Sequence, residues 1–140
     1  MWKAIDVSDN QGAINWAQIP KNVDFAILRS VRRSGKADHQ FAANLEGCRK
    51  RNIPMSVYKY TYAATPEAAR QEAQQVVALL QSYGLTGTMV WWDVEDKDVL
   101  RPLGAAKLTE CIRAAQEVIT AAGYSFGLYV GLYVYNERWF

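Results

Sequence analysis

Short apolar runs with strand character alternate with helical patterns from one end of the chain to the other, and no other feature constrains its fold as strongly. The strand patterns cover residues 4–8, 25–29, 55–62, 88–95 and 126–130. The second of these is a continuous apolar run behind Asp24, which is typical of a strand buried on both faces. Strands that alternate with helices at this spacing predict βαβ units and a parallel sheet with right-handed crossovers. The expected fold class is α/β.

Four helices are expected beside these strands. The second has the clearest start, because the N-cap residue Thr65 is followed by Pro66 at the first helical position. The helical patterns run from Asp38 to Pro54, from Thr65 to Gly84, from about Leu108 to Gly123, and from Asn136 onward. Five strands with four helices fit an open doubly wound sheet or most of a barrel, and composition does not choose between them. A chain of 140 residues, half of them hydrophobic, predicts a single domain.

Charge and composition argue against several classes of protein. Sixteen basic and fourteen acidic residues leave a formal charge of +2, which is too small to predict nucleic-acid binding. No apolar stretch is long enough to span a membrane. Because a strand pattern begins directly after Lys3, we expect no typical signal peptide. Cys48 and Cys111 fall in separate helical patterns and are predicted to be reduced core thiols.

Polar residues stand at the ends of three predicted strands, where parallel α/β sheets bind their ligands. The first strand ends in Asp6 and Ser8, the second in Arg29, and the fourth in Asp93 and Glu95. Side chains two apart on a strand share a face and lie about 6.6 Å apart along it, close to the carboxylate separations of glycosidases. The pair Asp93 and Glu95 therefore predicts a carbohydrate-cleaving site.

The predicted roles of these carboxylates follow from their surroundings. Neighbouring carboxylates and the apolar Trp91, Trp92 and Val94 should raise the pKa of one member and keep it protonated near neutral pH. Glu95, nearer to solvent, suits proton donation, which leaves Asp93 and Asp6 to orient the substrate or stabilise positive charge. Two alternatives remain at this point. The segment is either a solvated acidic loop, with Asp96 and Asp98, or a Mg²⁺ or Ca²⁺ site.

Two other polar residues allow both a structural and a functional interpretation. His39 is the only histidine and is expected on the surface at a helix start, so histidine-based nucleophile activation would depend on it alone. Lys59, at the end of the third strand, either meets a substrate or forms a structural ion pair. No phosphate-binding glycine pattern is present.

The order of motifs resembles the glycoside hydrolase family 25 lysozymes, the Chalaropsis-type muramidases that are common among phage endolysins. The matching segments are Ile5-Asp6-Val7-Ser8, Gln11-Gly12, Ile14-Asn15-Trp16, residues 23–29, Asp38, Phe41, Asn44, Val57-Tyr58, Tyr60, Tyr62-Ala63, Ala68, Glu72-Ala73, Trp92-Asp93-Val94-Glu95, Ala122-Gly123-Tyr124 and Gly127-Leu128-Tyr129. Each is weak alone, and their order along the chain is specific.

The resemblance implies an irregular TIM-like (β/α) barrel of which residues 1–140 supply the first five strands. It also implies hydrolysis of the β-1,4 bond between N-acetylmuramic acid and N-acetylglucosamine in peptidoglycan. By it, Glu95 is the general acid, Asp93 its partner carboxylate and Asp6 a further active-site acid. The attacking group is either the substrate's own acetamido oxygen or a water molecule. Expected glycan contacts are Tyr60, Tyr62, Trp92, Arg29 and Tyr129.

The same resemblance sets the expected partners. Lysozymes of this type are usually metal-free, so no cofactor is expected, and the partners are peptidoglycan glycan strands rather than nucleic acid or membrane. A phage or bacterial protein of this kind is made in the cytoplasm and acts on the cell wall after release.

Three departures from the family pattern are visible. Residues 29–33 lack the small residues usual after the second strand, Lys59 stands where the family often has histidine, and the family's last strands have no counterpart. Without those strands the open sheet edges are expected to favour self-association. The alternatives to a muramidase are therefore a self-associating half-barrel without activity and a non-catalytic glycan-binding fragment that stacks sugars on Trp91, Trp92, Tyr60 and Tyr129.

Overall fold

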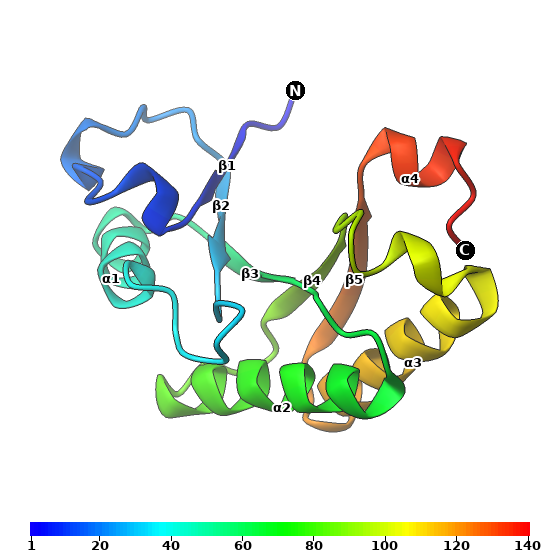
Figure 1. Cartoon of the computed structure of the whole chain (residues 1–140). Coiled ribbons are helices and arrows are strands. Elements are labelled where there is room, and N and C mark those ends of the chain that lie inside the picture. Colours follow the sequence, from blue (N-terminus) through cyan, green and yellow to red (C-terminus); the bar gives the residue numbers. More distant parts are fainter.

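The computed structural model describes all 140 residues of the chain, and its centre is one sheet of five parallel strands. The strands are β1 (Ala4–Val7), β2 (Phe25–Arg29), β3 (Met55–Tyr60), β4 (Met89–Val94) and β5 (Ser125–Val130). They follow one another in chain order, so β1 and β5 each have a single neighbour and the sheet is open (Figure 1). This order confirms the predicted barrel-like α/β fold, because a doubly wound sheet would reverse its strand order.

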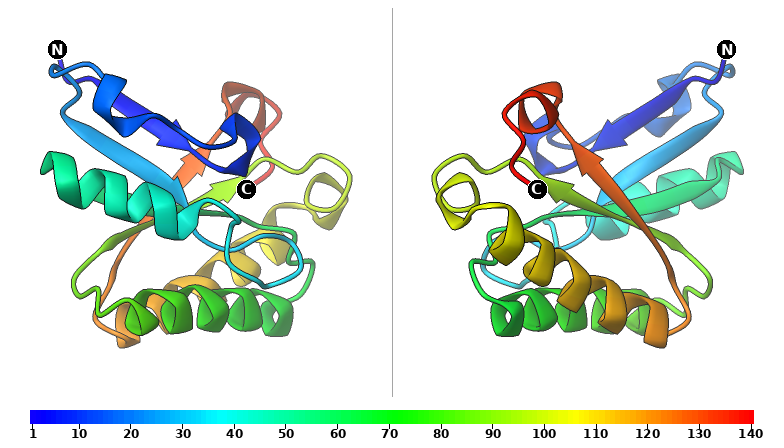
Figure 2. Two further views of the ribbon diagram at one scale, coloured as in Figure 1. Left: turned by 90° about the vertical axis from the view of Figure 1, so that its left-hand side faces the viewer. Right: turned by 90° about the vertical axis from the view of Figure 1, so that its right-hand side faces the viewer.

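Three long helices cover the convex side of the curved sheet (Figure 2). They are α1 (Phe41–Arg51), α2 (Pro66–Ser82) and α3 (Ala105–Ala121). The Thr65 hydroxyl caps α2 by accepting a hydrogen bond from the main-chain N–H of Ala68, as the Thr-Pro signal predicts. The connection from β1 to β2 contains no α-helix and is built on two 3-10 turns, Asp9–Gln11 and Trp16–Gln18.

The expected fourth long helix is wrong in both place and length. The only further helix, α4 (Leu132–Asn136), has five residues and ends where the predicted one begins. Its Leu-Tyr-Val-Tyr sequence favours a strand, and Gly131 separates it from β5. After α4 the chain turns at Arg138, whose φ is 53°, and buries the Trp139 ring against Tyr133 rather than continuing the helix.

The core lies between the sheet and the helices. Alternate residues of each strand point into it, so Val57, Val90 and Trp92 pack against the apolar stripes of α2 and α3. Cys48 and Cys111 are both buried and unpaired, which agrees with the prediction of core thiols. No helix combines the length and the apolar character needed to cross a membrane. The concave face carries no helix, so β2 is covered on one side only, and the expectation of two buried faces is wrong.

Candidate active site

A cavity of about 600 Å³ lies on the concave face, at the carboxyl ends of the strands. Its position follows from the topology, because parallel strands bring their carboxyl ends and the loops behind them to one edge. The lining residues are Asp6, Asn10, Phe25, Ile27, Arg29, Tyr58, Tyr60, Tyr62, Trp91, Asp93, Glu95 and Tyr129. Aromatic rings and carboxylates dominate this list. Such a surface suits a ligand with flat apolar faces and polar edges, as a sugar has.

Strand register places the central side chains at one level of the sheet. Asp93 on β4 is paired with Tyr60 on β3 and with Tyr129 on β5. The level below holds Trp91 beside Tyr58. Because paired residues of neighbouring strands point to the same face, the carboxylate of Asp93 lies between two aromatic side chains.

Asp93 is a buried carboxyl with an unusual electrostatic environment. Its residue is 8% exposed, and its Oδ1 atom is buried without a hydrogen-bond partner. Burial, with smaller effects from Glu95 and Asp6, raises the pKa of Asp93 from 3.8 to about 7. The sequence pattern predicts Glu95 as the proton donor, whereas the carboxyl whose pKa is raised by burial in the structure is Asp93. The reason is depth, since Asp93 lies within the strand and Glu95 follows its end, partly exposed.

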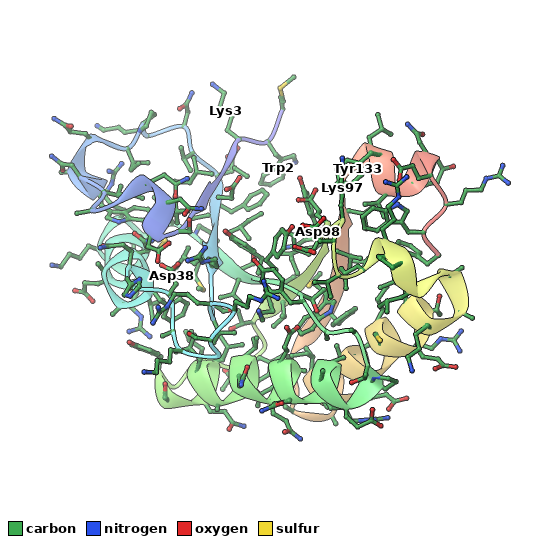
Figure 3. The ribbon with its side chains drawn as sticks, in the orientation of Figure 1. Trp2, Lys3, Asp38, Lys97, Asp98 and Tyr133 are labelled. Carbon is green, nitrogen blue, oxygen red and sulfur yellow. The ribbon has the colours of Figure 1, made fainter.

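Glu95 is held by the segment that follows β5. The Tyr133 hydroxyl donates a hydrogen bond of 2.7 Å to the main-chain oxygen of Glu95. The Tyr133 ring in turn lies under the ammonium of Lys97, 4.4 Å from its centroid, as Figure 3 shows for these two labelled residues. Gly131 leaves room for the carboxylate, because a Cβ atom there would lie 2.9 Å from Oε1 of Glu95. Helix α4 therefore anchors the main chain at Glu95, and Gly131 before it leaves space for the side chain.

Arg29 lines the cavity with its charge already shared between two carboxylates. Its Nη2 donates to Asp9 and its Nε to Asp38, both at 2.6 Å. Asp38 lies on the α1 side of the molecule (Figure 3) and also accepts hydrogen bonds from the main-chain N–H groups of Asp9 and Gln40. His39 bonds to Asp9, and mainly through this bond the pKa of Asp9 is lowered. The network fixes the turn that carries Asn10 into the cavity.

The structure brings together seven of the eight predicted site residues. Asp6, Asp93, Glu95, Tyr60, Tyr62, Arg29 and Tyr129 all line the cavity. Trp92 does not: it is 1% exposed and packs on the helix side against Phe126, so its assignment to the site is wrong. Alternation along the strand is the reason, because Trp92 and Asp93 point to opposite faces.

Lys59 and His39 lie outside the cavity. The ammonium of Lys59 is buried on the helix side, where it donates to the main-chain oxygen of Tyr60 and lies 3.8 Å from Glu72. Lys59 is thus a structural ion-pair residue and does not replace a groove histidine. His39 has a 62% exposed side chain, as expected for a surface residue. No group of three or more His, Cys, Asp or Glu side chains is arranged to hold a metal ion.

Sequence reasoning missed several lining residues. The predicted site residues do not include Asn10, Phe25, Ile27 and Tyr58, and Trp91 is predicted only as an apolar neighbour of the carboxylates and as a stacking surface in the non-catalytic alternative. Alternation could have found those on strands, since Phe25 and Ile27 share the face of Arg29 and Trp91 shares that of Asp93. Asn10 gives no such signal, because its position depends on the network around Arg29.

Comparison with known proteins decides the family. A family model described as glycosyl hydrolases family 25 matches residues 5–139. The chain belongs to glycosyl hydrolase family 25. A comparison with curated protein sequences gave no significant match.

Several solved structures share the fold. The modular autolysin LytC from Streptococcus pneumoniae superposes with a TM-score of 0.85 at 28% identity, over 96% of this chain and 33% of that one. LytC has also been solved in complex with a synthetic peptidoglycan ligand. The catalytic domain of endolysin ply40 from Listeria monocytogenes bacteriophage P40 gives 0.80 at 23% identity, over 98% and 67%. A bacterial lysozyme from Streptomyces coelicolor gives 0.79 at 19% identity, over 97% and 65%. The chain thus spans a third of LytC and about two thirds of the other two.

Proposed function

We propose that this protein hydrolyses peptidoglycan as a muramidase, cleaving the β-1,4 bond between N-acetylmuramic acid and N-acetylglucosamine. The observation that carries the proposal is the pair Asp93 and Glu95 on one wall of an aromatic-lined cavity in a family 25 chain. Trp91, whose ring lies across Gly127, and the two tyrosines beside Asp93 offer flat surfaces for sugar rings. The site of action that we propose is the cell wall, reached after release from the producing cell.

The proposed reaction begins with a proton shared between the two carboxyls. In the ligand-free cavity, burial raises the pKa of Asp93 to about 7 and so favours its protonated form. A sugar acetamido N–H that donates to Asp93 would favour its ionised form and leave the proton to Glu95. Binding of the substrate would then prepare Glu95 as the acid, while Asp93 and Asp6 face the charge that develops at the sugar.

The bond changes balance without a cofactor. Glu95 transfers its proton to the glycosidic oxygen as the bond between that oxygen and the anomeric carbon breaks, and the leaving sugar takes the bonding electrons. The substrate's acetamido oxygen or a water oxygen then bonds to the anomeric carbon. In either route one water molecule is consumed, its proton returns to Glu95, and the products are two shorter glycans with one new reducing end.

The experiment is an assay of reducing ends released from purified peptidoglycan, with Glu95→Gln compared with Asp98→Asn. Removing a general acid is expected to slow the reaction by about a hundredfold or more. Asp98 is exposed and outside the cavity, so its substitution removes one acidic charge and should leave the rate unchanged. A Glu95→Gln protein that retains its rate would overturn the assignment of the acid. Saturable glycan binding without new reducing ends would instead support the non-catalytic alternative.

We further propose that the chain self-associates through its sheet edges. β1 and β5 each leave one side of their main chain without a strand partner. On β5 and the helix that follows it, Leu128, Leu132 and Tyr135 expose 39%, 74% and 75% of their surface. A second copy of the chain supplies both a matching edge and an apolar surface. Self-association of this kind would not depend on catalysis.

A further inference from the structure

Arg33 is an exposed residue that lies over the ring of a cavity residue and has no carboxylate partner. It belongs to the loop between β2 and α1, and its guanidinium carbon is 4.4 Å from the centre of the Tyr62 ring. Tyr62 lines the cavity. Arg33 takes part in none of the salt bridges of the structure. A guanidinium stacked on a ring keeps its in-plane N–H groups free, so it can still bind an anion edge-on.

The other cations near Tyr62 are neutralised. Lys59 lies 5.5 Å from the centre of the same ring, beside the carboxylate of Glu72. Arg29 is held between two carboxylates, as described above. Of the two cations that lie over the Tyr62 ring, Arg33 is therefore the one without a carboxylate partner.

The position of Tyr62 is itself well determined. Glu72 accepts hydrogen bonds from the main-chain N–H of Tyr62 at 3.0 Å and from the hydroxyl of Thr61 at 2.6 Å. The Tyr60 and Tyr62 rings are 5.0 Å apart. Because Tyr60 is paired with Asp93 in the sheet, two adjacent rings connect the carboxylates to the guanidinium of Arg33. A glycan lying on these rings with its scissile bond at Asp93 would extend toward Arg33.

We infer that Arg33, stacked on Tyr62, is a subsite for a carboxylate carried by the glycan next to the cleaved bond. The inference rests on the proposed function, and it makes the preferred substrate an anionic glycan rather than a neutral N-acetylglucosamine polymer. The muramyl sugar carries a lactyl ether whose carboxyl group is either free or joined by an amide bond to a peptide with carboxylates of its own. Both supply the planar anion that a guanidinium binds through two parallel hydrogen bonds.

The test is a calorimetric binding series in the Glu95→Gln background, which is expected not to turn over. The ligands are an N-acetylglucosamine tetramer, a peptide-free peptidoglycan glycan of equal length, and the same glycan with its peptides. Arg33→Gln removes the charge, Arg33→Lys keeps it without the planar fork, and Arg113→Gln is the control. Arg113 is exposed on α3, outside the cavity, and gives the same change in net charge.

We expect Arg33→Gln to weaken binding of an anionic glycan about threefold to fivefold, with the neutral tetramer unaffected. The loss should shrink at high salt, Arg33→Lys should show part of it, and Arg113→Gln none. A peptide converts the lactyl carboxylate into an amide, so a loss with the peptide-free glycan alone assigns the anion to the lactyl group. A loss with the peptide-bearing glycan alone assigns it to the peptide, and a loss with both means that Arg33 binds either carboxylate.

Three results would overturn the subsite. Equal losses for all three ligands would mean that Arg33 only supports Tyr62. Unchanged affinities in Arg33→Gln would show that Arg33 makes no contact with the glycan. If neither the Glu95→Gln protein nor the unaltered chain binds any of the ligands, the proposed function fails and the subsite fails with it. By contrast, glycan binding that is retained and shows no Arg33 effect with any of the three ligands, as in the second result, removes the subsite and leaves the proposed function standing.

Discussion

The hydroxyl of Tyr133 donates a hydrogen bond to the main-chain oxygen of Glu95, and this bond ties a five-residue helix to the end of β4. The two residues are 38 positions apart, so the contact exists only when β5 has paired with β4 and the chain has turned at Gly131. Burial, with a smaller effect from Glu95, raises the pKa of Tyr133, so its hydroxyl stays a donor across the neutral range. The position of the proposed acid therefore depends on a segment outside the catalytic strand.

Tyr133→Phe should lower the rate of glycan hydrolysis severalfold and leave KM unchanged. The substitution removes the hydrogen bond but keeps the ring under Lys97, so Glu95 loses positional restraint without losing its surroundings. The expected loss of stability is about 1 kcal/mol, the usual effect of one hydrogen bond. Steady-state kinetics and thermal denaturation measure the two effects. Tyr135→Phe, at a 75% exposed position of the same helix, should change neither.

Gly131→Ala should disturb the same contact by a different route. The backbone at Gly131 has φ −69° and accepts alanine, but the added Cβ would lie 2.6 Å from the Tyr133 ring and 2.9 Å from Oε1 of Glu95. One of the two side chains must move, so we expect lower activity with unchanged far-ultraviolet circular dichroism. Ser125→Ala, at the exposed start of β5, is the control. Full activity in Gly131→Ala would show that the carboxylate has more freedom than the structure gives it.

Asp93→Asn should remove a pH dependence of stability. The pKa of Asp93 is raised from 3.8 to about 7, so between these values the folded chain binds a proton that the unfolded chain has released. Below about pH 4 the group does not reduce the free energy of unfolding. As pH rises from there through 7, the free energy of unfolding falls by up to ~4 kcal/mol. Asn keeps the shape without the charge. The variant should therefore melt higher than the unaltered chain at pH 8 and close to it at pH 4. If the variant and the unaltered chain differ in melting temperature by the same amount at pH 4 and pH 8, the raised pKa is contradicted.

Local pattern was enough to predict the strands, the sheet type and the carboxylate pair. Alternation places Asp93 and Glu95 on one face, and parallel topology carries them to the ligand-binding edge. The sequence also predicts that Glu95 is nearer to solvent than Asp93. That burial raises the pKa of Asp93 to about 7 was not predictable, because this burial depends on residues of neighbouring strands, among them Tyr60 and Tyr129. The partners of Arg29 were not predictable either, since they come from two separate loops.

The prediction that Trp92 contacts the glycan is wrong, although the alternation of side chains along the strand was enough to exclude it. Trp92 directly precedes Asp93 on the strand. Its side chain therefore points to the opposite face of the sheet, together with that of Val94. Trp92→Phe should lower the free energy of unfolding by about 1–3 kcal/mol through lost core volume and leave glycan affinity unchanged. Trp91→Phe keeps a ring over Gly127 but loses the hydrogen bond to Ser56, so its main effect should be weaker glycan binding. Chemical denaturation and binding calorimetry on both variants would separate the two roles.

Self-association through the sheet edges should depend on the apolar side chains beside β5. Leu132 is 74% exposed at the start of α4, the helix that directly follows β5. A lysine there would place a charge where a second copy would pack, and edge lysines oppose strand pairing. We therefore expect the unaltered chain to form dimers or larger species at tens of micromolar in light scattering, and Leu132→Lys to shift it toward monomer. Ala106→Lys adds the same charge on an exposed position of α3 and should not change the mass. A monomer at every concentration would show that the open edges do not pair, and it would leave the glycan chemistry of Asp93 and Glu95 untouched.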